Sequence, residues 1–203
     1  MNRASMRCGL LSVYLLSMVG CAATATVTSL PQAVRRIAVL PPYYPGGPET
    51  SNDSIYQNGY QLRSQTVGDV LAQQARARLA AKGFDVVEPS VVKLETGGRA
   101  PTNIQTAAQI ARDAKLDAAA LYIEIRRWLP TPYETGMKAD GVIVALDLTI
   151  VDPKTGAILW QVHRPSRPVP LYGVVLTGQG NVFVAEAVMQ EIFAQLAPRQ
   201  PTG

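Results

Sequence analysis

Acidic side chains and a single histidine are the residues of this chain best suited to catalysis. Glu124 and Asp147 fall in two segments of alternating apolar and polar residues, and Asp152 follows the second segment. Two carboxylates on either side of a bond are the usual machinery of glycoside hydrolysis. Asp147 with Asp152, or Glu124 with Asp147 across neighbouring strands, could form such a pair. An envelope hydrolase that uses Glu124 and Asp147 is therefore one alternative for the function.

The other residues that could take part in catalysis or phosphate binding lack the partners that these activities require. His163 could act as a general base, but no Gly-x-Ser-x-Gly motif supplies a nucleophile for it. We expect it on the surface at the end of a strand, and Asp152 in a turn. Segment 173–180 is rich in glycine before a helical pattern, yet it lacks the spacing and lysine of a phosphate-binding loop. We therefore predict no catalytic residues.

Metal, cofactor and nucleic-acid sites are not indicated. Two cysteines and one histidine are too few ligands for a zinc, haem or iron–sulfur site. The 19 Lys and Arg residues form no basic run and no aromatic–basic stripe, despite a formal net charge of +4. We predict no metal, no cofactor and no nucleic-acid partner.

The first twenty residues are typical of an export signal. Arg3 and Arg7 precede a short apolar stretch, which ends with Gly20 directly before Cys21. The run Ser17-Met18-Val19-Gly20-Cys21 resembles the lipobox of bacterial lipoproteins, with an ordinary secretory signal as the alternative. The resemblance implies a diacylglyceryl group on the Cys21 sulfur, cleavage before Cys21 and acylation of the new amine.

The same resemblance implies a location and a domain plan. Ala22 follows the cysteine instead of aspartate, which implies the outer membrane and a domain that faces the periplasm. Residues 21–34 are small and polar and predict a flexible tether. Residues 35–198 predict the binding domain, and 199–203 a loose tail.

The elements that must position these residues alternate along the chain. The pattern predicts one compact α/β (α+β) domain, with a mixed sheet of about five strands packed by three helices. Asp147 and Thr149 mark one strand face as at least partly solvated. Thr102 and Gln105 have the spacing of a helix capping box. Strands are expected at 36–40, 84–89, 117–129, 142–150 and 157–162, and helices at 67–82, 102–115 and 181–196.

Four segments carry a family resemblance: 36–42, 82–87, 114–121 and 148–160. Together they are similar to envelope lipoproteins related to the penicillin-binding-protein activator LpoB, the curli-secretion lipoprotein CsgG and the N-terminal domain of TolB. They are also similar to an uncharacterised lipoprotein group of that superfamily. The resemblance implies a compact α/β domain that docks a protein partner in the cell envelope, and no catalytic residues.

Tyrosines in the long loops are the candidate partner-binding residues. Aromatic side chains beside prolines give rigid contact area with one polar end, which suits protein interfaces. Packing of these rings over the sheet edge is the equal alternative. The residues are Tyr43, Tyr44, Tyr56, Tyr60, Tyr133 and Tyr172.

These observations lead to one hypothesis and two alternatives. The hypothesis is a membrane-anchored periplasmic lipoprotein, a protein-binding assembly or regulatory factor for peptidoglycan synthesis or export, with self-association left open. One alternative is the hydrolase. The other is a subunit of an oligomeric export pore, although segments 42–64, 130–141 and 164–180 lack a pair of strands with alternating apolar and polar residues.

Overall fold

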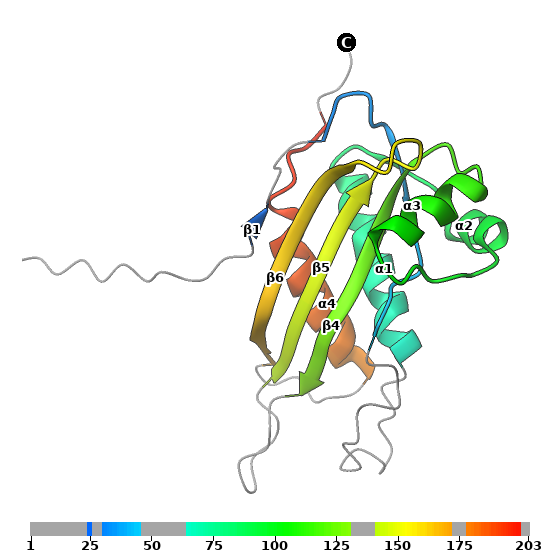
Figure 1. The fold of residues 1–203 in the computed structure, drawn as a ribbon. Coiled ribbons are helices and arrows are strands. Elements are labelled where there is room, and N and C mark those ends of the chain that lie inside the picture. Colours follow the sequence, from blue (N-terminus) through cyan, green and yellow to red (C-terminus); the bar gives the residue numbers. More distant parts are fainter. Residues whose placement is uncertain (1–23, 26–29, 46–63, 131–140, 172–177, 200–203) are drawn as a thin grey trace, which may run out of the picture.

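The computed structural model describes residues 24–25, 30–45, 64–130, 141–171 and 178–199. These residues form one mixed six-stranded sheet and four helices (Figure 1). The predicted α/β domain with a mixed sheet is therefore confirmed. One short strand and one short helix among the described residues go beyond the prediction.

Parallel and antiparallel pairing divide the sheet. Its strands are β1 (Thr24–Ala25), β2 (Arg36–Val39), β3 (Asp85–Val86), β4 (Ala119–Pro130), β5 (Gly141–Val151) and β6 (Ile158–Pro170). Its helices are α1 (Ser64–Ala81), α2 (Pro89–Thr96), α3 (Ile104–Asp113) and α4 (Gly178–Phe193). The strand order is β1-β6-β5-β4-β2-β3. β2 runs parallel to β3 and β4, whereas β4, β5, β6 and β1 are antiparallel neighbours.

Helices α1 and α4 cover one whole face of the long strands (Figure 1), which we call the covered face. Every second residue of the strands points there, as the two-residue period of a strand requires. Trp160 of β6 is fully buried and stacks on Phe193 of α4, with ring centroids 5.7 Å apart. The strand residues of this core include Leu121, Ile123, Ile125, Leu146, Leu148 and Ile150.

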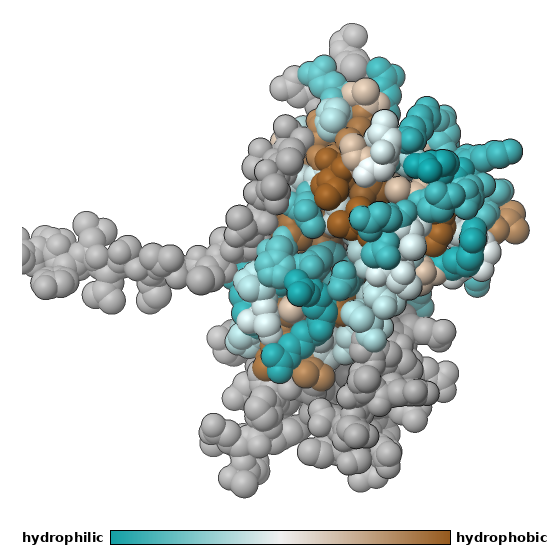
Figure 2. Space-filling model, in the orientation of Figure 1, coloured by the Kyte–Doolittle hydropathy of each residue, from teal (hydrophilic) through white to brown (hydrophobic). Residues whose placement is uncertain are grey.

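Helices α2 and α3 cover only part of the opposite face, which we call the open face. Small residues of α3, including Ala107 and Ala111, pack on Ala120 and Tyr122 of β4. In Figure 1 no described helix lies in front of the lower parts of β4, β5 and β6. Figure 2 shows hydrophilic side chains over this lower part and apolar ones toward the upper ends of the strands.

The sixth strand is longer than the sequence pattern predicts. The pattern ends it at Val162, whereas β6 continues to Pro170 and includes Pro165 and Pro168. Proline lacks an N–H donor and is tolerated where one side of a strand needs no donor. Within the described residues, β6 pairs with β5 on one side and only with Thr24–Ala25 on the other, so the prolines disturb few of the hydrogen bonds seen there.

The short helix α2 is not among the predicted elements, because the sequence pattern predicts a strand that ends at Pro89. Pro89 is instead the first residue of α2, where a missing N–H leaves no hydrogen bond unmade. The capping box of α3 is also shifted by one residue from Thr102 and Gln105. Asn103 Oδ1 accepts from Thr106 N at 2.8 Å, and Thr106 Oγ1 accepts from Asn103 N at 3.0 Å.

Part of the predicted tether lies on the domain. Thr24 and Ala25 pair with His163 and Val162 of β6. Leu30 and Val34 are partly buried against the core of the covered face. In the part of the chain that the structure describes, no helix combines the length and apolarity that crossing a membrane requires.

Candidate functional site

Three neighbouring strands place polar residues in one row on the open face. Glu124 of β4 is the register partner of Asp147 of β5, and Asp147 is the register partner of His163 of β6. Residues that face each other across antiparallel strands point to the same side of the sheet. The adjacency of Glu124 and Asp147 that the hydrolase alternative requires is therefore confirmed. His163 lies within the strand and not at its end, which corrects the prediction.

Asp147 is held from both sides. Arg126 Nη1 donates to Asp147 Oδ2 at 3.1 Å, and His163 Nδ1 donates to Asp147 Oδ1. The Asp147 side chain is 20% exposed, whereas those of Arg126 and His163 are about half exposed. Both oxygens of this carboxylate are thus engaged at the surface. Ala145 and Thr149, the neighbours of Asp147 on the same face of β5, are both buried, so Asp147 is a partly exposed residue between them.

Glu124 has a buried phenol as its neighbour. Tyr122 Oη donates to Glu124 Oε2 at 3.2 Å, and Tyr122 itself is only 2% exposed. Burial, and then the negative charge of Glu124, raise the pKa of Tyr122. The phenol therefore stays protonated and remains a hydrogen-bond donor to the carboxylate.

Two of the six candidate tyrosines lie in the described part of the chain, and both pack onto the sheet. Tyr43 continues the line of β2: its N–H donates to Ile123 O at 2.8 Å, and its C=O accepts from Ile125 N at 2.7 Å. Its side chain is partly buried against the core of the open face. Tyr44 is partly buried against the other core, and this burial raises its pKa. Tyr56, Tyr60, Tyr133, Tyr172 and Cys21 lie outside the described residues.

Asp152 has the role in a turn that the sequence predicts. Its carboxylate accepts from Lys154 N at 2.9 Å and from Thr155 Oγ1 at 2.8 Å. These hydrogen bonds, that of Lys154 first, hold the pKa of Asp152 below its usual value. Asp152 is therefore tied into the β5–β6 turn, away from the row of Glu124 and Asp147. Within the described residues no group of three or more His, Cys, Asp and Glu side chains could hold a metal ion.

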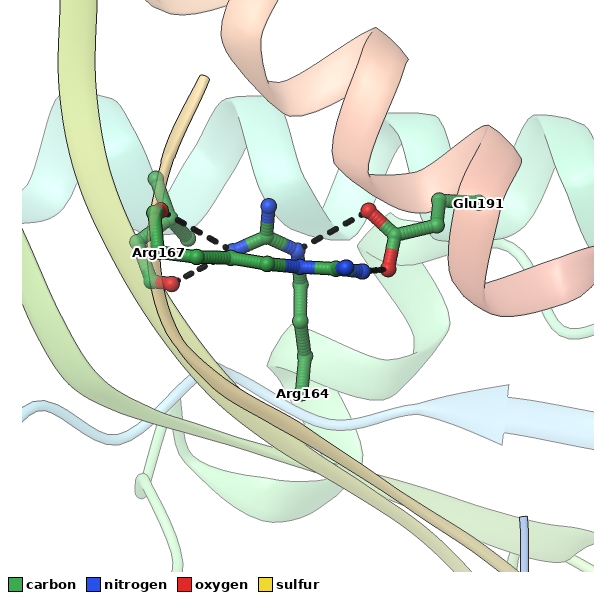
Figure 3. Close-up of polar contacts among 4 residues, drawn as sticks. Arg164, Arg167 and Glu191 are labelled. Atoms are coloured by element: carbon green, nitrogen blue, oxygen red, sulfur yellow. Dashed lines mark hydrogen bonds and ion pairs between the residues drawn. The ribbon is translucent and has the colours of Figure 1, made fainter. Parts of the chain in front are cut away.

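A buried ionic cluster, which the sequence does not predict, connects β6 to α4 (Figure 3). Arg164 is 2% exposed; its Nε donates to Glu191 Oε2 at 3.1 Å and its Nη1 donates to Val144 O. Arg167 donates to the other oxygen of Glu191. Burial, and then the charge of Arg167, lower the pKa of Arg164 to about 10. A register shift between β5 and β6 aims these arginines at the helix, and strict alternation could not have revealed it.

A groove of about 900 Å³, also not predicted from the sequence, lies at the end of the sheet where β2 and β4 begin. Three segments that are distant in sequence line most of it: 31–36, 111–119 and 152–154. The hairpin and helix-end patterns of these segments are visible in the sequence. Their convergence depends on the sheet order and carries no local signal.

Comparison with known proteins gives a fold and no family. No family model matches the chain, and no curated protein matches its sequence. Among solved structures, the fold is similar to two crystal forms of a PelC dodecamer from Paraburkholderia phytofirmans, with 16% and 18% identity and TM-scores of 0.52 and 0.50. Each match covers 88% of this chain and 99% of PelC.

Two other solved structures, one of them a lipoprotein, show weaker likeness. Lipoprotein GNA1162 from Neisseria meningitidis is 18% identical, with a TM-score of 0.46, over 77% of this chain and 96% of that chain. The LpoB C-terminal domain from Salmonella enterica is 16% identical, with a TM-score of 0.38, over 68% of this chain and 83% of that chain. The solved structures that resemble this chain thus include bacterial lipoproteins, and what the chain demonstrably shares with PelC is the fold.

Proposed function

We propose that the chain is a lipid-anchored lipoprotein of the bacterial cell envelope that binds a protein partner and catalyses no reaction. The anchor is the lipidated Cys21, in the periplasmic leaflet of the outer membrane. The partner belongs to an envelope machine for peptidoglycan synthesis or export. The observation that carries the proposal is the open face, where Glu124, Asp147 and His163 form a polar row that no described helix covers.

The contacts of the row favour recognition over hydrolysis. A glycoside hydrolase needs one carboxyl group that gives a proton to its substrate and a second that is free to attack or to activate water. Asp147 already accepts through both oxygens, from Arg126 and His163, and Glu124 accepts from Tyr122. Paired charges that stay partly exposed can exchange these bonds for bonds to a polar protein surface, which gives specificity to an interface.

The pairing of β1 makes the proposed anchor short. Cys21 precedes Thr24 by three residues, and Thr24 pairs with His163. Three extended residues span at most about 11 Å. A lipidated Cys21 would therefore keep the edge of β6 close to the bilayer, and its confinement would raise the effective concentration of the open face for membrane partners.

Self-assembly is the second candidate. PelC, whose fold this chain shares, forms a dodecamer. Light scattering of the mature domain without detergent tests this candidate: a single mass of one chain argues against a ring, and a discrete multiple supports it.

Photocrosslinking in cells tests the binding proposal. We would place a benzophenone amino acid at Arg126, on the open face, or at Gln73, an exposed residue of α1 behind the covered face. The expected result is one envelope protein captured from position 126 and not from position 73. Equal capture at both positions, or none at 126, would contradict the proposal. Peptidoglycan turnover by the mature domain that disappears in Asp147→Asn would favour the hydrolase.

The anchor has its own test. Cys21→Ser should abolish labelling by radioactive palmitate and leave the signal uncleaved at this site, so that the full-length chain accumulates in place of the mature form. A Cys21→Ser protein that still takes up label would show that another residue carries the lipid.

A further inference from the structure

The groove at the amino ends of β2 and β4, which we call the amino-end groove, lies outside the polar row. Its first wall is segment 31–36, which leads into β2. Its second wall is segment 111–119, the end of α3 with the following turn. Its third wall is the β5–β6 turn at 152–154, with Asp85 and Leu159 completing the lining.

Polar contacts join the second wall to the third, and the pairing of β2 with β4 joins the first wall to the second. Arg112 Nε of α3 donates to Pro153 O at 2.7 Å, which joins the second wall to the third. Lys154 Nζ lies 4.0 Å from Asp117 Oδ1 and makes a second link between them. In the first wall Val34 N donates to Pro31 O at 2.9 Å. A ligand would therefore meet a formed surface and would not have to order three separate segments.

The charges of the groove favour a negative ligand. Its lining holds five Arg and Lys residues against three Asp residues. Each aspartate has a partner within the protein: Asp85 pairs with Arg36 at 3.3 Å, Asp117 with Lys154, and Asp152 accepts from its own turn. Among the described residues, the exposed side chains of Arg35 and Lys115 pair with no carboxylate.

Between these charges the lining is apolar. Val34, Leu116 and Leu159 contribute branched side chains, and Ala118 and Ala119 leave room beside them. An apolar floor between cationic rims matches a chain that presents apolar side chains and carboxylates alternately. An extended peptide does so, because its successive side chains point to opposite sides.

We propose that the amino-end groove binds an acidic, extended peptide segment of a protein partner. The inference rests on the proposed function in taking the chain to be a protein-binding module, and it adds a second surface and the chemistry of the partner. A peptide fits better than a small molecule because the groove is open to solvent, whereas small-molecule sites bury most of their ligand.

Fluorescence anisotropy with a defined probe tests the proposal on the mature chain. The probe is a labelled eight-residue peptide of alternating Glu and Leu, and the matched control peptide has Gln in place of Glu. Wild-type protein is expected to bind the Glu peptide at least about tenfold more tightly than the Gln peptide, with the difference shrinking as salt is raised. Equal binding of the two peptides would overturn the proposal.

Charge reversal locates the site. The double variant Arg35→Glu with Lys115→Glu should weaken binding of the Glu peptide at least about tenfold, because both side chains change from attraction to repulsion. Lys93→Glu with Arg99→Glu, two exposed residues in and just after α2, is the matched control with the same change of net charge and should change binding less than about twofold. An equal loss in both would show unspecific charge attraction and would overturn the proposal. The Tm of each variant shows that it is folded.

The peptide-binding experiment on the groove and the crosslinking experiment on the open face can succeed or fail separately. If the peptide fails to bind while position 126 captures an envelope protein, the proposed function stands and the inference about the groove is wrong. If the peptide binds in the groove while no partner is captured and Cys21 carries no lipid, the groove stands and the envelope proposal is wrong.

Discussion

The two faces of the sheet carry ion pairs that differ in burial. On the covered face, Arg164 is almost completely buried and is neutralised by Glu191 of the helix packed above it. On the open face, Asp147 is neutralised by Arg126 and His163 in contact with solvent. Removing one partner of a buried ion pair leaves a desolvated charge, whereas removing one partner of an exposed pair leaves a charge that water can solvate.

This difference separates the residues that hold the fold from those that are free to bind. The covered face joins β4, β5 and β6 to α1 and α4 through fully buried apolar side chains. A substitution there changes the folding equilibrium before it changes any interface. Substitutions in the polar row leave this core intact, so that their effects on binding can be measured in a folded protein.

The largest difference between the faces is expected at Trp160. Trp160→Ala removes a fully buried ring that stacks on Phe193, and should lower the free energy of unfolding by about 3–5 kcal/mol in urea titration. Ile158→Ala, two positions earlier in the same strand and 46% exposed, is the control and should cost about 1 kcal/mol or less. Similar losses in the two variants would mean that the packing on α4 contributes little.

A smaller effect is expected at the ionic cluster. Glu191→Gln removes the countercharge of Arg164 and should lower the free energy of unfolding by about 2 kcal/mol, since the guanidinium stays buried. Glu186→Gln, whose partner is Arg78 and whose side chain is 55% exposed, should change it by about 1 kcal/mol or less. If urea titration ranks Glu186→Gln as the more harmful change, the distinction between buried and exposed pairs fails in this protein.

The sequence predicted the elements that have a regular pattern. Strict alternation located β4 and β5, and thereby placed Glu124 and Asp147 on neighbouring strands. The first helix, predicted to end at residue 82, ends at Ala81, and Gly83 just beyond it has φ +86°, a conformation that glycine adopts without strain. These features depend only on local geometry, and a local pattern is enough to find them.

The missed features depend on tertiary context. Pro165 and Pro168 are unfavourable within a strand unless one side of it is nearly unpaired, and the sequence does not show that β6 has such a side. Because the sequence pattern ends this strand at Val162, it does not place His163 beside Asp147. Arg164 is buried because the register shifts beside it, and the groove exists because three distant segments meet.

A substitution of Asp147 tests whether the open face serves binding and not stability. Asp147→Ala breaks the contacts to Arg126 and His163, both of them about half exposed, so the free energy of unfolding should fall by about 1 kcal/mol or less. Capture of an envelope partner at position 126 should nevertheless fall several-fold, because the row loses its central charge. Asp69→Ala, at an exposed position of α1, should leave capture of the partner unchanged. A large loss of stability in Asp147→Ala would mean that the open face holds the fold.

The smallest effect is expected at Asp152, in the turn that joins β5 to β6, and its size should depend on pH. Hydrogen bonds from Lys154 N and Thr155 Oγ1 depress the pKa of Asp152 in the folded state. Its contribution to stability is therefore present above the pKa of the unfolded chain and is lost as the pH falls through the folded value. Asp152→Ala should have a lower Tm than wild type at pH 7, and the difference should shrink toward pH 2.

Asp152→Asn separates charge from hydrogen bonding in this turn. Its amide oxygen can still accept from Lys154 N but does not titrate, so its Tm should lie between those of wild type and Asp152→Ala at pH 7 and should follow the alanine variant's pH dependence. A difference from wild type that stays constant down to pH 2 would mean that the turn is held by the shape of residue 152 and not by its charge. Both substitutions lie in the turn and leave the two faces unchanged. The change in Tm that they cause is therefore the smallest effect against which the effects at the faces can be judged.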